Sequence, residues 1–499
     1  MAPSPHVKPP FISRRGAVAS EHPYASMAGL RVLEEGGNAV DAAVAISFTL
    51  AVSQPALNGL GGDFMATVLR GDRTSFVNGS GWAPRRLTVD LVRGKLGLGS
   101  IPRYGPLSAV VPGMVDGVHA MWREFGSMEW GHLLSFAVRR AREGLPASPA
   151  LRAAVGSLDG SYSDANTRRT YSAGRWERVD LSGLAAAIEG IAEHGPEFFY
   201  RDVGAAIAGY VSSLGGVMEP DDFSEYRAEV SGTVSCTYRG YTVHESPPNS
   251  QGITTLLILR ELEGEGRGTV EPRAMLEAYA RAYALRDRYV ADPRFVRVPV
   301  EELLSGGVGG RGREGTTASP ARPLGGGDTT NFVVADSKGM VVSGIQSLYH
   351  GFGSRVTEPS YQVTLNNRAS DFSMEGPNRV EPRKRPLHTL SSVIVTRDGE
   401  PFVALGTSGG HFRPQQHALL IVDMVDRGMD VVEAIDSPRF LWDGGSVIAE
   451  EGADTGGIDA RRIPYPGATG VAHAIQFRGA DRIAYADPRG EGLALGEMD

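Results

Sequence analysis

Apolar residues recur at helical spacing through most of the first two thirds of the chain. Between Tyr24 and Val52 they fall three or four positions apart, which predicts helix, and the Gly-Gly-Asn at 36–38 divides this stretch into two helices. The apolar run 43–52 is too short to span a bilayer and is followed by Gln54 and Pro55, so we expect a buried core helix. The same spacing predicts helices over residues 115–145, 184–194, 203–214, 253–261 and 273–290.

Alternating apolar and polar positions predict strands, most of which lie in the last third of the chain. The segment 331–347 is expected to form two strands joined by a turn at Asp336–Gly339. Another strand follows the glycine-rich turn Gly59–Gly62, where a close approach of the backbone would explain the glycines. Further strands are expected over residues 238–245, 361–367, 391–396 and 401–408, and late helices over 414–428 and 430–435.

Residues 302–328 separate the helix-rich part from the strand-rich part. This segment is rich in Gly, Arg, Ser and Pro and has no apolar period, which predicts a linker or mobile loop. Its Arg-Gly dipeptides would also suit a contact with RNA, but the acidic balance of the whole chain opposes that interpretation. A strand-type run begins directly after Asp328, so the linker ends at two threonines.

The charge and composition of the chain exclude several classes of function. The 499 residues carry a formal net charge of −8, which argues against nucleic acid or an anionic membrane as a partner. No apolar run is long enough to span a membrane, and the basic N-terminus has no apolar region behind it, so we expect a cytoplasmic protein without a secretory signal. The single cysteine, Cys236, allows no internal disulfide and is interpreted as a small core residue. No spacing of His, Cys, Asp and Glu indicates a metal site, and no cofactor is expected.

The sequence GGGDTTNFVVAD at 325–336 places Thr329 and Thr330 between the linker and a strand. One interpretation is that both are ordinary strand-entry residues, because threonine favours strands. A phosphate-binding loop would need a lysine and a following helix, and both are missing. A third interpretation is an N-terminal nucleophile: cleavage before Thr329 would create an α-amino group with a pKa of roughly 8, which can act as the base for the hydroxyl. A flexible segment that leads into a rigid strand meets the requirement for such a cleavage.

Eight motifs spread over nearly the whole chain carry a further signal. They are EEGGNAVDAAVA (34–45), GLGGDF (59–64), AVVPGMVDG (109–117), PPNSQG (247–252), DTTNFVVAD (328–336), NNRASDFS (366–373), KRPLHTLSS (384–392) and TSGGHFRPQ (407–415). Together they resemble the γ-glutamyltranspeptidase family of self-processing N-terminal nucleophile hydrolases. GGNAVDAAVA and a DTT at the head of a strand are specific in combination, whereas either alone would be weak.

The resemblance implies an αββα fold, with two stacked and mostly antiparallel sheets between outer layers of helices. It also implies cleavage between Asp328 and Thr329 into a large subunit, 1–328, and a small subunit, 329–499. Because both subunits build the sheets, they are expected to stay interwoven as one globular unit, and a homodimer of these units is left open.

The resemblance also implies roles for individual residues. Thr329 matches the threonine that attacks the substrate carbonyl, and Ser347 matches a threonine that hydrogen-bonds this nucleophile. Gly409 and Gly410 match the pair whose amides form the oxyanion hole, a role that suits glycine because the amides must approach the oxyanion closely. Asp371 matches the acidic residue that receives the α-amino group of the substrate.

Five positions depart from the family members that act on glutathione. Ser80, in NGSGWAP, stands where those enzymes carry an arginine that holds the substrate α-carboxylate, and a serine cannot make that charge-assisted contact. Arg368 stands at a position of Gln or Glu, and the family has an asparagine near Tyr349. His388 and Thr389 replace paired serines. At these positions the chain resembles the branch of the family that contains oxamate amidohydrolases and cephalosporin acylases.

Two of these residues leave alternatives open. Arg368 returns a positive charge to the pocket and would bind a carboxylate or an oxamate-like group; alternatively, it pairs with Asp371, three residues along. His388 is either a residue of the substrate pocket or a hydrogen-bonded structural residue.

The function that we favour is an amide hydrolase that acts on a small acyl substrate through an acyl-enzyme. One alternative is a γ-glutamyl hydrolase or transpeptidase with a different carboxylate clamp, for which Arg368 is the candidate. The other is an inactive family member that acts as a binding protein.

Overall fold

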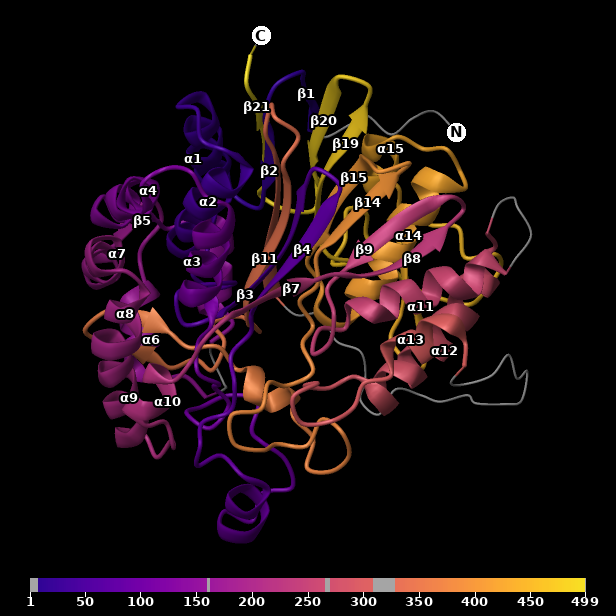
Figure 1. Ribbon diagram of the computed structural model, residues 1–499. Helices are drawn as coiled ribbons and strands as arrows, with labels where there is room; N and C mark the ends of the chain where they lie inside the picture. The colour runs from indigo at the N-terminus through magenta and orange to yellow at the C-terminus, as the bar shows by residue number, and fades with distance from the viewer. Residues whose placement is uncertain (1–7, 159–161, 265–269, 308–327, 499) are drawn as a thin grey trace.

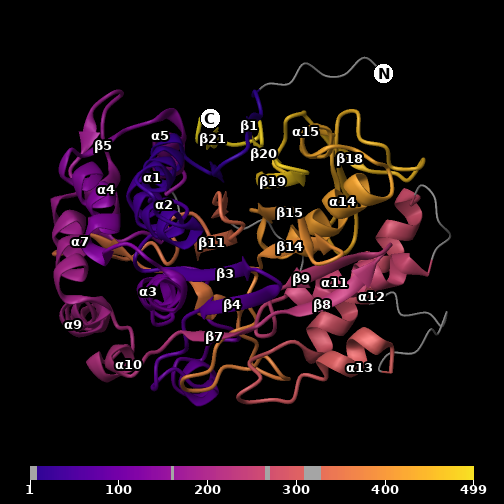
Figure 2. The ribbon, with the colours of Figure 1, turned by 45° about the horizontal axis from the view of Figure 1, so that its top comes forward.

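Two β-sheets lie face to face at the centre of the molecule, and helices cover the outer face of each (Figure 1, Figure 2). The computed structural model describes residues 8–158, 162–264, 270–307 and 328–498. The expected αββα architecture is confirmed, and every pair of neighbouring strands in the two main sheets is antiparallel among the described residues.

Each main sheet has seven strands drawn from distant parts of the chain. The order of the first sheet is β21 (Leu493–Gly496), β2 (Ala17–Ser20), β10 (Asp328–Ala335), β11 (Val341–Tyr349), β3 (Asp63–Arg70), β4 (Arg73–Gly79) and β7 (Glu229–Gly232). The order of the second sheet is β1 (Phe11–Ser13), β20 (Asp481–Ala486), β19 (Ala472–Arg478), β15 (Glu400–Thr407), β14 (Val393–Arg397), β9 (Tyr241–Glu245) and β8 (Val234–Tyr238). In the first sheet the central strands β10 and β11 therefore lie between strands from the N-terminal part of the chain.

Small apolar side chains fill the space between the two sheets. Strands β10 and β11 of one sheet face β15 and β19 of the other. The buried cluster between them is rich in alanine, including Ala17, Ala19, Ala335, Ala404 and Ala484. Short side chains let the facing strands approach closely, which brings the ends of β10 and β15 together.

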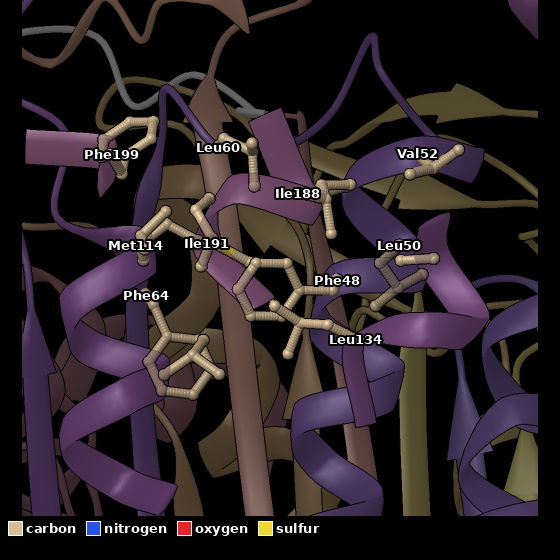
Figure 3. Close-up of a cluster of buried hydrophobic side chains, with 14 of the residues drawn as sticks. Phe48, Leu50, Val52, Leu60, Phe64, Met114, Leu134, Ile188, Ile191 and Phe199 are labelled. Atoms are coloured by element: carbon tan, nitrogen blue, oxygen red, sulfur yellow. The ribbon is translucent and has the colours of Figure 1, made fainter. Parts of the chain in front are cut away.

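The helices on the first sheet bury a large apolar cluster. These helices are α1 (Pro23–Glu34), α2 (Ala39–Ser53), α3 (Met114–Phe125), α4 (Trp130–Arg142) and α7 (Ser182–His194). Figure 3 shows Phe48, Leu134 and Ile188 of this cluster gathered from three different helices. All 15 residues of α2 are buried, as expected for a core helix, and among the described residues no helix has both the length and the apolar character that crossing a membrane requires.

The predicted break between the first two helices has a visible cause. The Asn38 side chain accepts hydrogen bonds from the amides of Val40 and Asp41, while the Asp41 carboxylate accepts one from the Asn38 amide. This capping box provides hydrogen-bond acceptors for amides that the first turn of a helix cannot pair internally. Such a cap stabilises the fold by about 1 kcal/mol. The second helix therefore restarts at Ala39.

The second sheet carries its own layer of helices. They are α11 (Gly252–Glu263), α12 (Pro272–Tyr289), α14 (Arg413–Val425) and α15 (Val431–Asp436). The other helices of the described residues are η1 (Asp90–Lys95), α5 (Pro149–Gly156), α6 (Ala165–Tyr171), α8 (Pro196–Phe198), η2 (Phe199–Val203), α9 (Gly204–Ser213), α10 (Pro220–Ser224), α13 (Val300–Ser305), η3 (Arg368–Asp371) and η4 (Gly410–Phe412). Short strands pair as β5 (Leu145–Pro146) with β6 (Arg178–Val179), β12 (Thr357–Glu358) with β13 (Val363–Thr364), and β16 (Phe440–Trp442) with β17 (Val447–Glu450) and β18 (Arg461–Ile463).

Three expected segments differ from the structure. Residues 238–245 form the turn of a hairpin and its second strand, because Arg239 and Gly240 adopt positive φ values of 53° and 87° and reverse the chain. The strand expected over 361–367 contains only the two residues of β13. The linker begins later than expected, since α13 covers 300–305 and buries Leu303, while 308–327 lie outside the described residues.

Candidate active site

Thr329 is the second residue of β10, and its side chain is buried. Its hydroxyl donates a hydrogen bond to Ser347 Oγ on the neighbouring strand β11, with an oxygen–oxygen distance of 3.2 Å. The register between the two strands shifts between Asp328 and Thr330, and such an irregularity re-aims a side chain. Ser347 Oγ in turn accepts the amide of Tyr349 at 2.7 Å, which holds the serine hydroxyl in place.

The glycine-rich turn before β3 allows this part of the site to close. A Cβ atom on Gly62 would lie 2.5 Å from the Ser347 carbonyl oxygen, and one on Gly61 would lie 2.1 Å from the Thr364 carbonyl oxygen. Only glycine permits backbone contacts this close. The turn leads to Asp63, which pairs with Ser347 in the sheet and is fully buried.

Gly409 and Gly410 follow the end of β15. Their φ values are +124° and +58°, and a Cβ atom on Gly409 would lie 2.6 Å from Gln416 Nε2. Within the described part of the chain neither amide donates a hydrogen bond, whereas the Gly410 carbonyl accepts one from Gln251 at 2.9 Å. Two free amides on a fixed backbone are what an oxyanion hole requires. The nearby Gly406 packs against Asn331 of β10, so this end of β15 lies beside the strand that carries Thr329.

A buried ion pair joins Arg368 to Asp63. Arg368 Nε lies 3.4 Å from Asp63 Oδ2, and its Nη1 donates to Thr389 Oγ1 at 2.7 Å. Both charged side chains are completely buried, and Arg368 Nη2 has no hydrogen-bond partner among the described residues. A buried guanidinium with a spare donor is suited to bind an anionic group.

His388 lies against the other side of Asp63. Its Nδ1 accepts the amide of Leu390 at 3.1 Å, so the neutral ring carries its proton on Nε2, which lies 3.1 Å from Asp63 Oδ2. Burial, followed by the charge of Arg368, lowers the pKa of His388 to about 4. Burial opposes ionisation of Asp63, but His388, Arg368 and the Gly81 amide together hold the pKa of Asp63 below its usual value. The cluster therefore contains a neutral histidine, a carboxylate and a guanidinium.

A second buried guanidinium approaches from α14. Arg413 donates from Nη1 to the Thr389 carbonyl and from Nε to the Thr407 carbonyl at 2.6 Å. Burial, followed by the charge of Arg368, lowers the pKa of Arg413 well below its usual range. Thr389 thus lies between two cationic side chains, and an anion placed there would relieve their mutual repulsion.

Asp371, Tyr349 and His411 form the opposite side of the cluster. The Tyr349 hydroxyl donates to Asp371 Oδ1 at 3.1 Å and lies 3.2 Å from His411 Nε2. The Tyr349 ring centroid lies 4.0 Å from Arg368 Cζ, which is a cation–π distance. Tyr349 adopts a φ of +87°, a conformation that a side chain rarely takes and that costs of order 1–3 kcal/mol.

Ser80 lies in the wall of the cluster. Its hydroxyl donates to Asn78 Oδ1 at 2.6 Å and accepts Asn249 Nδ2 at 3.2 Å, while its neighbour Gly81 donates its amide to Asp63. Among the described residues its hydroxyl makes no hydrogen bond to Arg368 or Asp371.

The structure thus brings together the residues singled out in the sequence and adds three that were missed as site residues, Asp63, Tyr349 and His411. Asp63 belongs to GLGGDF and His411 to TSGGHFRPQ, so the motifs contained both without indicating that either faces the cluster. Tyr349 was noted only as lying near a family asparagine. Among the described residues no group of three or more His, Cys, Asp or Glu side chains is placed to hold a metal ion.

Two sheets packed between helical layers, with this cluster at the end of the central strands, define an N-terminal nucleophile hydrolase fold. The chain belongs to the γ-glutamyltranspeptidase family, whose sequence model, described as gamma-glutamyltranspeptidase, matches residues 25–497. The expected family and fold are therefore confirmed.

The relatives of the chain are hydrolases. It is 37% identical to the glutathione hydrolase-like YwrD proenzyme of Bacillus subtilis, over 97% of this chain and 99% of the relative. It is 30% identical to the oxamate amidohydrolase proenzyme of Klebsiella pneumoniae, over 86% and 85%. Among solved structures, a cephalosporin acylase from Bacillus halodurans superimposes with a TM-score of 0.91 and 29% identity, covering 100% of this chain and 99% of that one. The chain is an enzyme, an amide hydrolase of this family.

We predict that His388 makes the stability of the fold depend on pH. The pKa of His388 is about 4 in the fold and roughly 6.5 in an unfolded chain, so between these values only the unfolded state binds the proton. The contribution of neutral His388 to the free energy of unfolding is complete above pH ~6.5. It is lost as the pH falls toward 4, by at most about 1.4 kcal/mol per pH unit. His388→Gln should flatten this part of the urea-unfolding profile. His194→Gln, at an exposed position, serves as the control, and a His388→Gln profile parallel to that of the wild type would contradict the assignment.

Proposed function

We propose that this chain is a self-processing amide hydrolase whose nucleophile is the N-terminal threonine created by its own cleavage. The observation that carries the proposal is the position of Thr329 at the head of β10, with its hydroxyl bonded to Ser347. The amides of Gly409 and Gly410 follow the end of β15, whose Gly406 lies against Asn331 of β10. The proenzyme names of the relatives agree with a precursor that is cut.

Maturation begins with attack of the Thr329 hydroxyl on the carbonyl carbon of Asp328. The peptide C–N bond breaks, the acyl group moves to the threonine oxygen, and the amine takes up the proton. Water then hydrolyses the ester to give the subunits 1–328 and 329–499. The subunits stay together because β10 and β11 of the small subunit pair with β2 and β3 of the large one.

In the catalytic cycle the new α-amino group takes the proton of the Thr329 hydroxyl, which attacks the amide carbonyl. The amides of Gly409 and Gly410 stabilise the oxyanion, and Ser347 orients the hydroxyl. The amine departs with a proton from the α-ammonium group, which leaves an acyl-enzyme. Water releases the acid, and an acceptor amine in its place would give acyl transfer.

The acyl group is small and carries a carboxylate. The spare Nη2 donor of Arg368 and the adjacent Thr389 hydroxyl support this assignment. His388 lies against Asp63, Ser80 bonds to Asn78, and Asp371 accepts the hydroxyl of Tyr349, whose ring covers Arg368. The alternative substrate is a γ-glutamyl amide, which the name of the Bacillus subtilis relative favours. The serine at position 80 weighs against it, because a serine hydroxyl cannot make a charge-assisted contact with an α-carboxylate, and this one is bonded to Asn78 and Asn249.

The proposal is tested on the purified protein. A denaturing gel should show two bands of about 35 and about 18 kDa, in proportion to the two fragment lengths of the 53.1 kDa chain. N-terminal sequencing of the smaller band should start Thr-Thr-Asn-Phe. A persistent band of full length, or a small fragment with another first residue, would refute the proposed nucleophile.

A further inference from the structure

A surface cavity of about 520 Å³ lies between α1, α2 and α4, in the outer layer of helices (Figure 1, Figure 2). A volume of this size is typical of pockets that hold small molecules. On its other side α2 packs against β10 and β11, the strands that carry Thr329 and Ser347. The residues that line the cavity are different from those of the active-site cluster, so it is a separate site.

Part of the lining is apolar. It includes Met27 and Leu30 of α1 and Phe136 of α4. Met27 is 59% exposed, while Leu30 and Phe136 are partly buried against the core. Large apolar side chains that remain in contact with water around a cavity are typical of a binding site for an apolar group.

The charged part of the lining is mainly positive. Three arginines and one glutamate line the cavity, although the whole chain carries a net charge of −8. Arg31 is paired with Glu35 at 3.0 Å, and Arg140 is paired with Glu143 at 2.6 Å. Within the described part of the chain the exposed Arg139 makes no ion pair, so its guanidinium is free to bind an anionic group.

A buried hydroxyl also lines the cavity. Thr49 of α2 is only 2% exposed, and its Oγ1 has no hydrogen-bond partner among the described residues. A threonine inside a helix commonly bonds the carbonyl four residues before it, as Ser53 does with the Thr49 carbonyl at 2.8 Å. The Thr49 hydroxyl is therefore a donor without an acceptor, and a ligand oxygen in the cavity would supply one.

This hydroxyl and the cations lie toward the same end of the cavity. A short turn joins α1 to α2, so the two helices are antiparallel, and they meet at Gly29 and Ile46. Tyr24 precedes Gly29 and Thr49 follows Ile46, which places both toward one end of the helix pair. The Arg140 guanidinium lies 4.2 Å from the Tyr24 ring centroid and belongs to that end as well.

We propose that this cavity binds an amphipathic monocarboxylic acid. The carboxylate accepts hydrogen bonds from Arg139, the neighbour of Arg140, and from the Thr49 hydroxyl. The apolar chain lies along Leu30 and Phe136.

The far end of the cavity limits the ligand to one carboxylate and a chain of medium length. Leu30 is six positions after Tyr24, which is about 9 Å along α1. Glu34 lines the cavity one turn beyond Leu30, and its carboxylate would repel a second carboxylate on the ligand.

Three eight-carbon compounds test the proposal by titration calorimetry on the purified protein. Octanoate carries one carboxylate, octylamine has the same chain with a positive charge, and octanedioate has a carboxylate at each end. Octanoate should bind at one site, with a Kd at least ~10-fold lower than that of either of the other two.

Two substitutions locate the bound acid. Arg139→Gln removes the free cation, and Thr49→Val removes the unpaired hydroxyl while keeping the shape of the side chain. Each should raise the Kd of octanoate by ~5-fold, and both variants should fold because neither breaks an existing side-chain contact. The matched control is Arg123→Gln on α3, which removes another exposed arginine that has no ion pair in the described ranges and should leave the Kd unchanged.

The proposal is overturned if octanoate shows no saturable binding below ~1 mM, or if octylamine or octanedioate binds as tightly. Octanoate binding that is equal in the wild type, Arg139→Gln and Thr49→Val also overturns it, because the acid then binds elsewhere, as at Arg368. The proposed amide hydrolysis uses none of these cavity residues, so it stands or falls independently of these results.

Discussion

Thr329→Ala is expected to leave the purified protein as a single chain of full length and to lower amide hydrolysis by at least ~10³-fold. The substitution removes the only oxygen that is proposed to attack the Asp328 carbonyl, so the precursor is not cut. It therefore removes both the nucleophile and the α-amino group that would serve as its base. The measurements are a denaturing gel and hydrolysis of a panel of acyl anilides.

The neighbouring residue provides the matched control. Thr330 is also a buried threonine on β10, but its hydroxyl donates to the Gln346 carbonyl at 3.3 Å and not to Ser347. Thr330→Ala should be processed and active, whereas Thr329→Ser should retain slow processing because a hydroxyl remains. Normal cleavage of Thr329→Ala would exclude Thr329 as the nucleophile of maturation.

Arg368→Met is expected to lower the free energy of unfolding by about 3–5 kcal/mol and to abolish selective hydrolysis of carboxylate-bearing substrates. The loss of stability arises because Asp63 would remain charged and buried without its partner. The loss of selectivity arises because the spare donor would disappear. Unfolding is best followed in the Thr329→Ala background, where the protein stays a single chain.

A double-mutant cycle separates these two effects. Asp63→Asn added to Arg368→Met removes the unpaired charge, so it should recover part of the lost stability without restoring the preference for a carboxylate. Arg31→Met, which breaks an exposed ion pair with Glu35, should cost at most about 1 kcal/mol. A double variant as unstable as Arg368→Met alone would show that the ion pair with Asp63 is not the cause.

Much of the secondary structure could be predicted from local pattern. The helices near residues 24–52 and the two strands around Asp336–Gly339 lie where apolar spacing placed them. The hairpin turn at Arg239 and Gly240 was missed, because positive φ at a non-glycine residue is set by the surrounding chain. The helix α13 was missed because Leu303 is the one apolar side chain of a single turn that is fully buried.

The candidate site was only partly accessible from sequence. Pairing of Arg368 with Asp371, three residues along, was the natural local alternative. The structure gives Arg368 an ion pair with Asp63, which is 305 positions away in the chain. A contact between residues so far apart in the chain produces no periodic pattern in a single sequence, since it depends on how the starts of β3 and η3 meet.

The sequence by itself determined most of the helices and strands, because these depend on the order of residues within short segments. Its motifs also carried the family resemblance that implied the layers of the fold, and the junction at Thr329 stays a prediction. Tertiary structure alone decided the chemistry around the junction. Arg286, Tyr349, Asp371 and His411 come from four separate elements, and their hydrogen bonds acquire a direction only when these elements pack together. The physical reason is that the protonation and reach of each side chain depend on its neighbours in space.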